Sequence, residues 1–96
     1  MSREKEIEVI REYLKRSFVG VHISHQDDFS PESHSFKVKS KGGSLLLSVT
    51  EDFMDLHTLE TLDAYLNSNH VAEKMSEHPG KIVVIVTTGI TIKDRS

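Results

Sequence analysis

The chain has 96 residues, no cysteine, no tryptophan and 12 Lys and Arg against 15 Asp and Glu, which gives a net charge of −3. The missing cysteine excludes disulfide frameworks, Cys-ligated zinc and thiol nucleophiles. The longest apolar run, residues 82–86, is far shorter than the roughly 18 residues of a membrane-spanning helix.

We therefore expect one domain over residues 1–96, folded around a single core. The first 20 residues mix Glu, Lys and Arg with apolar positions and lack the pattern of a signal peptide. The sequence thus predicts a cytoplasmic protein that does not enter a membrane.

The first third of the chain changes from a helical to a strand pattern. Residues 4–16 carry apolar side chains at the three- and four-residue spacing of one helical face. From Phe18 the period changes to two, which predicts a strand to about Ser24. Residues 26–32 are polar, acidic and interrupted by proline, so we expect a long loop there, followed by a second strand over about residues 33–40.

A Gly-Gly pair at positions 42 and 43 separates two alternating segments. Such a pair predicts a two-residue hairpin turn. If Lys41 faces Ser44, Val38 lies opposite Leu47, and the apolar positions of both strands share one side of the sheet.

The next segment predicts helices. Thr50 can cap a short helical turn, and the helix restarts at residue 57 or 58. The apolar stripe jumps at residues 67–69, which indicates two short helices that meet at an angle. The His-Pro-Gly stretch at residues 78–80 ends the second one.

Residues 82–86 form an unbroken β-branched run, which predicts an interior strand covered on both faces. Since helices lead into it from the third strand, parallel pairing through a right-handed crossover is available. Ile90 and Ile92 either extend this strand or form a short return. The sequence therefore predicts an α+β fold, a two-layer mixed sheet of four to five strands with the element order α-β-β-β-α-α-β.

The predicted element order is similar to the core of many nucleases that hold a metal with an Asp and a Glu-x-Lys motif. No Asp or Glu of this chain is followed two positions later by lysine. The first five elements also resemble double-stranded-RNA-binding domains. The basic start of their final helix is replaced here by Thr50-Glu51-Asp52, whose acids would repel phosphate. Phosphate-binding loops, zinc-protease His pairs and nucleophile elbows are missing as well, so the sequence favours neither an enzyme nor a cofactor.

The chain has six histidines, and one group of them permits metal chemistry. His25, Asp27, Asp28 and His34 flank the predicted acidic loop, where they can converge on a divalent ion. The other interpretation is a polar loop with surface histidines, and we predict no metal site. An enzyme with a small-molecule site around His25 to His34 remains a further alternative.

Charge is separated along the chain. Residues 35–50 contain three lysines and no acid, whereas residues 51–63 contain five acids and no Lys or Arg. In the predicted register the lysines follow one side of a strand, with an exposed leucine between them that suits a protein contact. The predicted interaction surface consists of Glu51, Asp52, Asp55, Lys37, Lys39, Lys41 and Leu46.

We therefore expect a non-catalytic interaction or regulatory domain, such as an inhibitor, immunity-type or adaptor protein, that binds a protein partner. The alternative is nucleic-acid binding through the lysine-lined sheet face. That face lacks the aromatic side chains on which bases stack, which disfavours nucleic acid. A homodimer formed by the last strands across a two-fold axis is also open.

Overall fold

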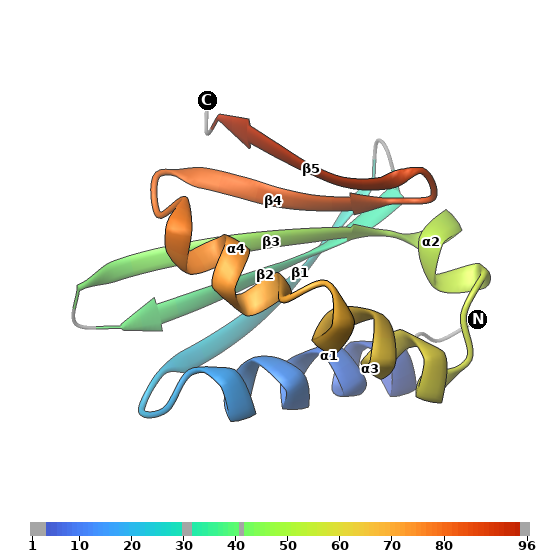
Figure 1. Cartoon of the computed structure of the whole chain (residues 1–96), viewed down its shortest axis with the longest axis horizontal. Coiled ribbons are helices and arrows are strands. Elements are labelled where there is room, and N and C mark those ends of the chain that lie inside the picture. The colour runs from blue at the N-terminus through green and yellow to red at the C-terminus, as the bar shows by residue number, and fades with distance from the viewer. Residues whose placement is uncertain (1–3, 30–31, 41, 95–96) are drawn as a thin grey trace.

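The computed structural model describes residues 4–29, 32–40 and 42–94, and at residues 27–29 and 32 it describes the backbone alone. Its helices and strands form two layers (Figure 1). The elements are α1 (Glu4–Ser17), β1 (His22–Phe29), β2 (Glu32–Ser40), β3 (Gly43–Thr50), α2 (Glu51–Asp55), α3 (Leu59–Ser68), α4 (Val71–Glu77), β4 (Lys81–Val86) and β5 (Gly89–Asp94). This order confirms the predicted mixed α+β fold. In the described part of the chain, no helix has both the length and the apolar character needed to cross a membrane.

The five strands lie in the sheet in chain order, β1-β2-β3-β4-β5. Strands β3 and β4 pair in parallel, and the other neighbours pair antiparallel. The parallel pair is joined by α2, α3 and α4, as expected, because parallel strands need a long crossover connection. The final residues form a return strand, since Val86 pairs with Gly89 across a two-residue turn.

The predicted acidic loop over residues 26–32 is wrong. Strand β1 continues to Phe29, which pairs with Glu32, so that only residues 30–31 separate the first two strands. Because β1 is an edge strand, it accommodates polar residues that sequence composition assigns to a loop. Val19, which the sequence placed in this strand, lies instead in the turn after α1 and is 92% exposed.

The hairpin between β2 and β3 is confirmed, but its predicted register is wrong by two residues. The structure pairs Ser40 with Gly43, whereas the sequence placed Lys41 opposite Ser44. A shift of two residues leaves every side chain on its own face, so the hydrophobic pattern fits both registers equally. Gly43 has φ 132°, a conformation that other residues rarely adopt, and it takes the first position of β3.

Helices cover one face of the sheet, which we call the inner face (Figure 1). Strand β4 lies inside the sheet as predicted, with Val83 and Ile85 fully buried in the core. Its alternate side chains are only half-buried, so the expectation that both faces are covered is wrong. The largest fully buried side chains are Phe36, Ile10, Leu14, Leu47, Met54, Leu62, Leu66, Met75 and Ile85.

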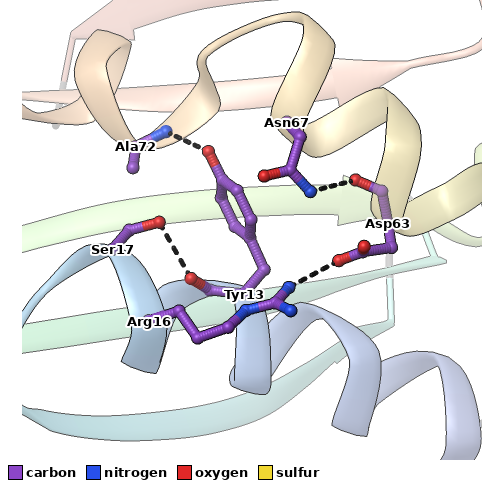
Figure 2. A network of polar contacts seen from close by, with 6 residues as sticks. All are labelled: Tyr13, Arg16, Ser17, Asp63, Asn67 and Ala72. Carbon is purple, nitrogen blue, oxygen red and sulfur yellow. Dashed lines mark hydrogen bonds and ion pairs between the residues drawn. The ribbon is translucent and has the colours of Figure 1, made fainter.

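The predicted break between two helices is confirmed, and α1 contacts the helices on both sides of it. Asn69 ends α3, and His70 adopts a left-handed conformation with φ 51° before α4 begins. The side chain of His70 makes no hydrogen bond that would cap the first turn of α4. The hydroxyl of Tyr13 on α1 fills this role by accepting a hydrogen bond of 2.9 Å from the backbone N–H of Ala72 (Figure 2). Arg16 of α1 also forms an ion pair with Asp63 of α3, with 2.7 Å between its Nη2 and Asp63 Oδ1 (Figure 2).

An ion pair closes the open end of the β4–β5 hairpin, where Lys81 Nζ lies 2.8 Å from Asp94 Oδ1. The hydrogen bond from Lys81 and its positive charge lower the pKa of Asp94 below the ordinary value. The unfolded chain therefore takes up a proton at a higher pH than the folded chain does. The stability contributed by this pair is present above a pH of about 4 and is lost as the pH falls through the lower folded pKa.

We expect the Asp94→Asn variant to lose less stability than the unmodified protein when the pH is lowered from neutral toward 3. Denaturant unfolding at a series of pH values measures this difference, which is small because the Asp94 side chain is 83% exposed. Lys81→Met should reduce the same pH dependence, since it removes the cause of the shift. Parallel stability profiles for the unmodified protein and Asp94→Asn would contradict the prediction.

Candidate functional site

The face of the sheet opposite the helices, here called the outer face, carries one continuous row of side chains across four strands. Lys37 on β2 pairs with Leu46 on β3, Leu46 pairs with Ile82 on β4, and Ile82 pairs with Lys93 on β5. Paired residues of neighbouring strands point to the same face. Two lysines therefore bracket two aliphatic side chains.

The aliphatic side chains in the middle of the outer face form a strip along β3 and β4. They are Leu46, Ile82, Val84 and Val86, all half-buried. No helix of the described chain covers them. The helices pack on the inner face, where their buried residues form one cluster with the inward-pointing strand residues. A water-facing side of an antiparallel or mixed sheet ordinarily carries polar residues. A contiguous apolar surface at this position is typical of a binding site.

Lysines lie on both sides of this aliphatic strip at its Ile82 end. Lys37 and Lys39 on β2 and Lys93 on β5 are exposed. The strand residues of the outer face whose side chains are described include no Asp, Glu or Arg, and these three are their only lysines. The outer face thus combines an apolar centre with positive side chains on both sides of one end.

The structure brings together some of the predicted site residues and separates others. Lys37, Lys39 and Leu46 share the outer face, and Lys41 lies outside the described residues. Sequence reasoning missed the contributions of β4 and β5, because the run in β4 resembled a strand buried on both faces. Only the parallel register between β3 and β4 shows that Ile82 adjoins Leu46.

The acidic residues of the predicted surface lie in α2, at the end of β3. Thr50 caps this helix as predicted by accepting a hydrogen bond from the backbone N–H of Phe53. Asp52 and Asp55 are exposed, whereas Glu51 is half-buried. The lysines begin four strand positions away from Thr50, a distance of roughly 13 Å, so acids and lysines do not form one patch.

Glu51 belongs to a chain of three polar side chains on the inner face. His34 Nε2 lies 3.2 Å from Glu51 Oε2, and His25 Nε2 lies 2.9 Å from His34 Nδ1. Both contacts are satisfied, for example, when His34 Nε2–H donates to Glu51 and His25 Nε2–H donates to His34 Nδ1. Both ring nitrogens of His34 are therefore used within the protein.

The metal hypothesis for this region receives no support from the described residues. None of them forms a group of three or more His, Cys, Asp or Glu side chains able to hold a metal ion. The side chains of Asp27 and Asp28 lie outside the described part of the structure. His34, only 4% exposed, sits between β1 and α2 as a structural link.

The outer face offers apolar area together with lysines whose backbone positions are set by the strands. This composition suits a bound segment that is apolar on one side and carries carboxylates along its borders. Comparisons of the chain with models of protein families, with curated proteins and with solved structures give no match.

Proposed function

We propose that this protein is a non-catalytic interaction domain that holds an acidic amphipathic helix of a partner protein on its outer face. The observation that carries the proposal is the row in which Lys37 and Lys93 bracket Leu46 and Ile82. A cytoplasmic location is part of the proposal, since a chain without cysteine fits a reducing compartment.

The dimensions of the outer face support a helix as the occupant. Lys37 and Lys93 are three strand spacings apart, which is roughly 14 Å. An α-helix with its side chains is roughly 10–12 Å wide. A single helix therefore fills the space between the lysines and brings its flanking residues within reach of them.

The length of the aliphatic strip also suits a short helix. Ile82 and Val86 are four strand residues apart, or roughly 13 Å. Two and a half helical turns, about nine residues, cover this length. Apolar residues at positions i, i+4 and i+7 of such a helix would follow the strip, and burying them supplies the attraction.

Charge makes an acidic partner the preferred one. Carboxylates on both sides of the bound helix would meet Lys37, Lys39 and Lys93, which speeds association and rejects basic competitors. The same lysines oppose stacking of two outer faces on each other, because like charges would meet. A bound helix of about nine residues forms a small interface, and small interfaces correspond to weak, transient complexes.

Two synthetic helical peptides test the proposal. Both carry the same apolar face, which is flanked by glutamates in one peptide and by lysines in the other. In fluorescence anisotropy titrations we expect the glutamate peptide to bind, more weakly as salt is added, and the lysine peptide not to bind. Lys37→Glu combined with Lys39→Glu should weaken binding at least tenfold, and so should Leu46→Thr. Lys15→Glu, the same charge reversal on the exposed side of α1, should leave binding unchanged.

Equal binding of both peptides, or binding that Leu46→Thr leaves intact, would contradict the proposal. Single- and double-stranded oligonucleotides form a third arm of the titration at low salt. If oligonucleotides bind, the double lysine variant abolishes that binding and neither peptide binds, the proposed partner would be nucleic acid and not a protein. Thermal unfolding of each variant verifies that its fold is retained.

The exposed acids Asp52 and Asp55 form a second predicted contact, separate from the outer face. Their charge reversal to lysine should weaken a partner that also contacts α2. Glu51 is a poor probe of this contact, because it also holds His34.

A further inference from the structure

Strand β5 forms one edge of the sheet (Figure 1). Half of its backbone N–H and C=O groups therefore point away from the sheet. Val86 and Gly89 flank a two-residue turn and therefore form a hydrogen-bonded pair. Since bonding alternates along an antiparallel pair, Thr91 and Lys93 bond toward β4. The N–H and C=O groups of the residues between them point outward from the edge.

The centre of this edge lacks the devices that ordinarily prevent strand pairing. Natural edges are protected by proline, a bulge, an inward-pointing charge or charged side chains such as lysine. In β5 the charged residues, Lys93 and Asp94, stand at the end of the strand. Strand β5 pairs with β4 without interruption from Gly89 to Asp94. Its middle residues are Ile90, Thr91 and Ile92, none of which protects an edge.

We propose that a second copy of this chain adds to the β5 edge, antiparallel and about a two-fold axis at Thr91. The Ile-Thr-Ile segment is symmetric about Thr91, so the axis sets Ile90 opposite Ile92 of the second copy and Thr91 opposite its equivalent. This register joins residues whose backbone groups point outward on both copies. The same surface patch is used twice, as a two-fold interface requires.

Charges are compatible with this register. Lys93 would lie opposite Gly89 of the second copy, and Asp94 remains bonded to Lys81 of its own chain. Among the residues that the structure describes, no like charges oppose each other across the pairing. Strand β1 at the other edge has no comparable symmetry in its sequence, His-Ile-Ser-His-Gln-Asp-Asp-Phe.

Pairing through β5 joins the two sheets into one of ten strands. The two outer faces then lie on the same side of that sheet, and a dimer offers two copies of the aliphatic strip. The pairing depends on the β5 edge alone and stands independently of the proposed helix binding.

A charge swap at the two-fold axis tests this register. Thr91 is exposed, so a charged residue there leaves the core unchanged. In Thr91→Lys two lysines would face each other, and in Thr91→Glu two glutamates, so each variant alone should raise the dimer dissociation constant at least tenfold. An equimolar mixture of the two variants should restore the dimer, because lysine then faces glutamate. Sedimentation velocity separates a monomer of 10.9 kDa from the dimer.

Thr88→Lys introduces the same charge in the adjacent exposed turn, where the register sets it opposite Asp94 of the second copy and not opposite another lysine, so it should leave the dimer intact. A wild-type protein that stays monomeric at high concentration overturns the proposal, as do single Thr91 variants that remain dimeric. Failure of the mixture to restore the dimer overturns the two-fold register. The Thr91→Lys monomer should still bind the glutamate-flanked peptide, which separates failure of pairing from failure of the proposed function.

Discussion

Replacing His34 with alanine is expected to lower the free energy of unfolding by about 3–4 kcal/mol, since it removes a buried ring and two hydrogen bonds. The side chain of His34 is 5% exposed and lies 3.2 Å from Glu51. Its ring also stacks on His25, with ring centroids 5.0 Å apart. The loss should be visible in denaturant unfolding at neutral pH.

A double-mutant cycle isolates the contact between His34 and Glu51. We expect a coupling energy of about 1–2 kcal/mol between His34→Ala and Glu51→Ala, because the two side chains share a charge-assisted hydrogen bond. Asp52→Ala serves as the matched control. Asp52 also lies in the first turn of α2, so it shares the helix-dipole contribution of Glu51 but not the histidine contact.

Additive effects of His34→Ala and Glu51→Ala would contradict this link. Equal coupling of His34 to Asp52 and to Glu51 would also contradict it, since the helix dipole, and not the contact with Glu51, would then cause the coupling. A specific coupling would identify the histidine chain as the contact that fixes the β1–β2 hairpin against α2.

Local signals predicted the helices well. Thr50 as a cap, the break at residues 67–69 and the stop at residues 78–80 all depend on the conformational preferences of a few adjacent residues. The structure confirms each of them. Such signals do not depend on distant parts of the chain, which is why sequence alone suffices.

Features that depend on distant partners were missed. The register of β2 on β3 could not be chosen from the hydrophobic pattern, because registers two residues apart bury the same faces. The open face of β4 depends on where the helices pack, and a β-branched run does not report this. His25, His34 and Glu51 come from three elements, and only the folded sheet brings them into contact.

The candidate site was predicted in part for the same reason. Charge separation along the chain identified Lys37 and Lys39, and the alternation of β3 identified Leu46. Ile82 and Lys93 join them only through the pairing of β3, β4 and β5. An interaction surface that spans a parallel strand pair therefore requires the topology, because a crossover separates its residues in sequence.

Replacing Tyr13 with phenylalanine is expected to lower the free energy of unfolding by about 1–3 kcal/mol, although the ring stays in place. The Tyr13 hydroxyl accepts the hydrogen bond of the Ala72 N–H, which lies at the start of α4 and has no acceptor within that helix. Phenylalanine leaves this buried donor without a partner. For a domain of this size each kcal/mol lowers Tm by roughly 4–8 °C, which calorimetry resolves.

Tyr65→Phe is the matched control for the loss of a tyrosine hydroxyl. The Tyr65 ring is half-buried against Phe53 and His57, and its hydroxyl makes no hydrogen bond with the residues that the structure describes. We expect this variant to change stability by less than about 0.5 kcal/mol. Equal losses in both variants would contradict a capping role for Tyr13. A loss confined to Tyr13→Phe means that α1 supplies the helix cap that His70 does not, because the left-handed turn before α4 leaves its first turn without a side-chain acceptor of its own.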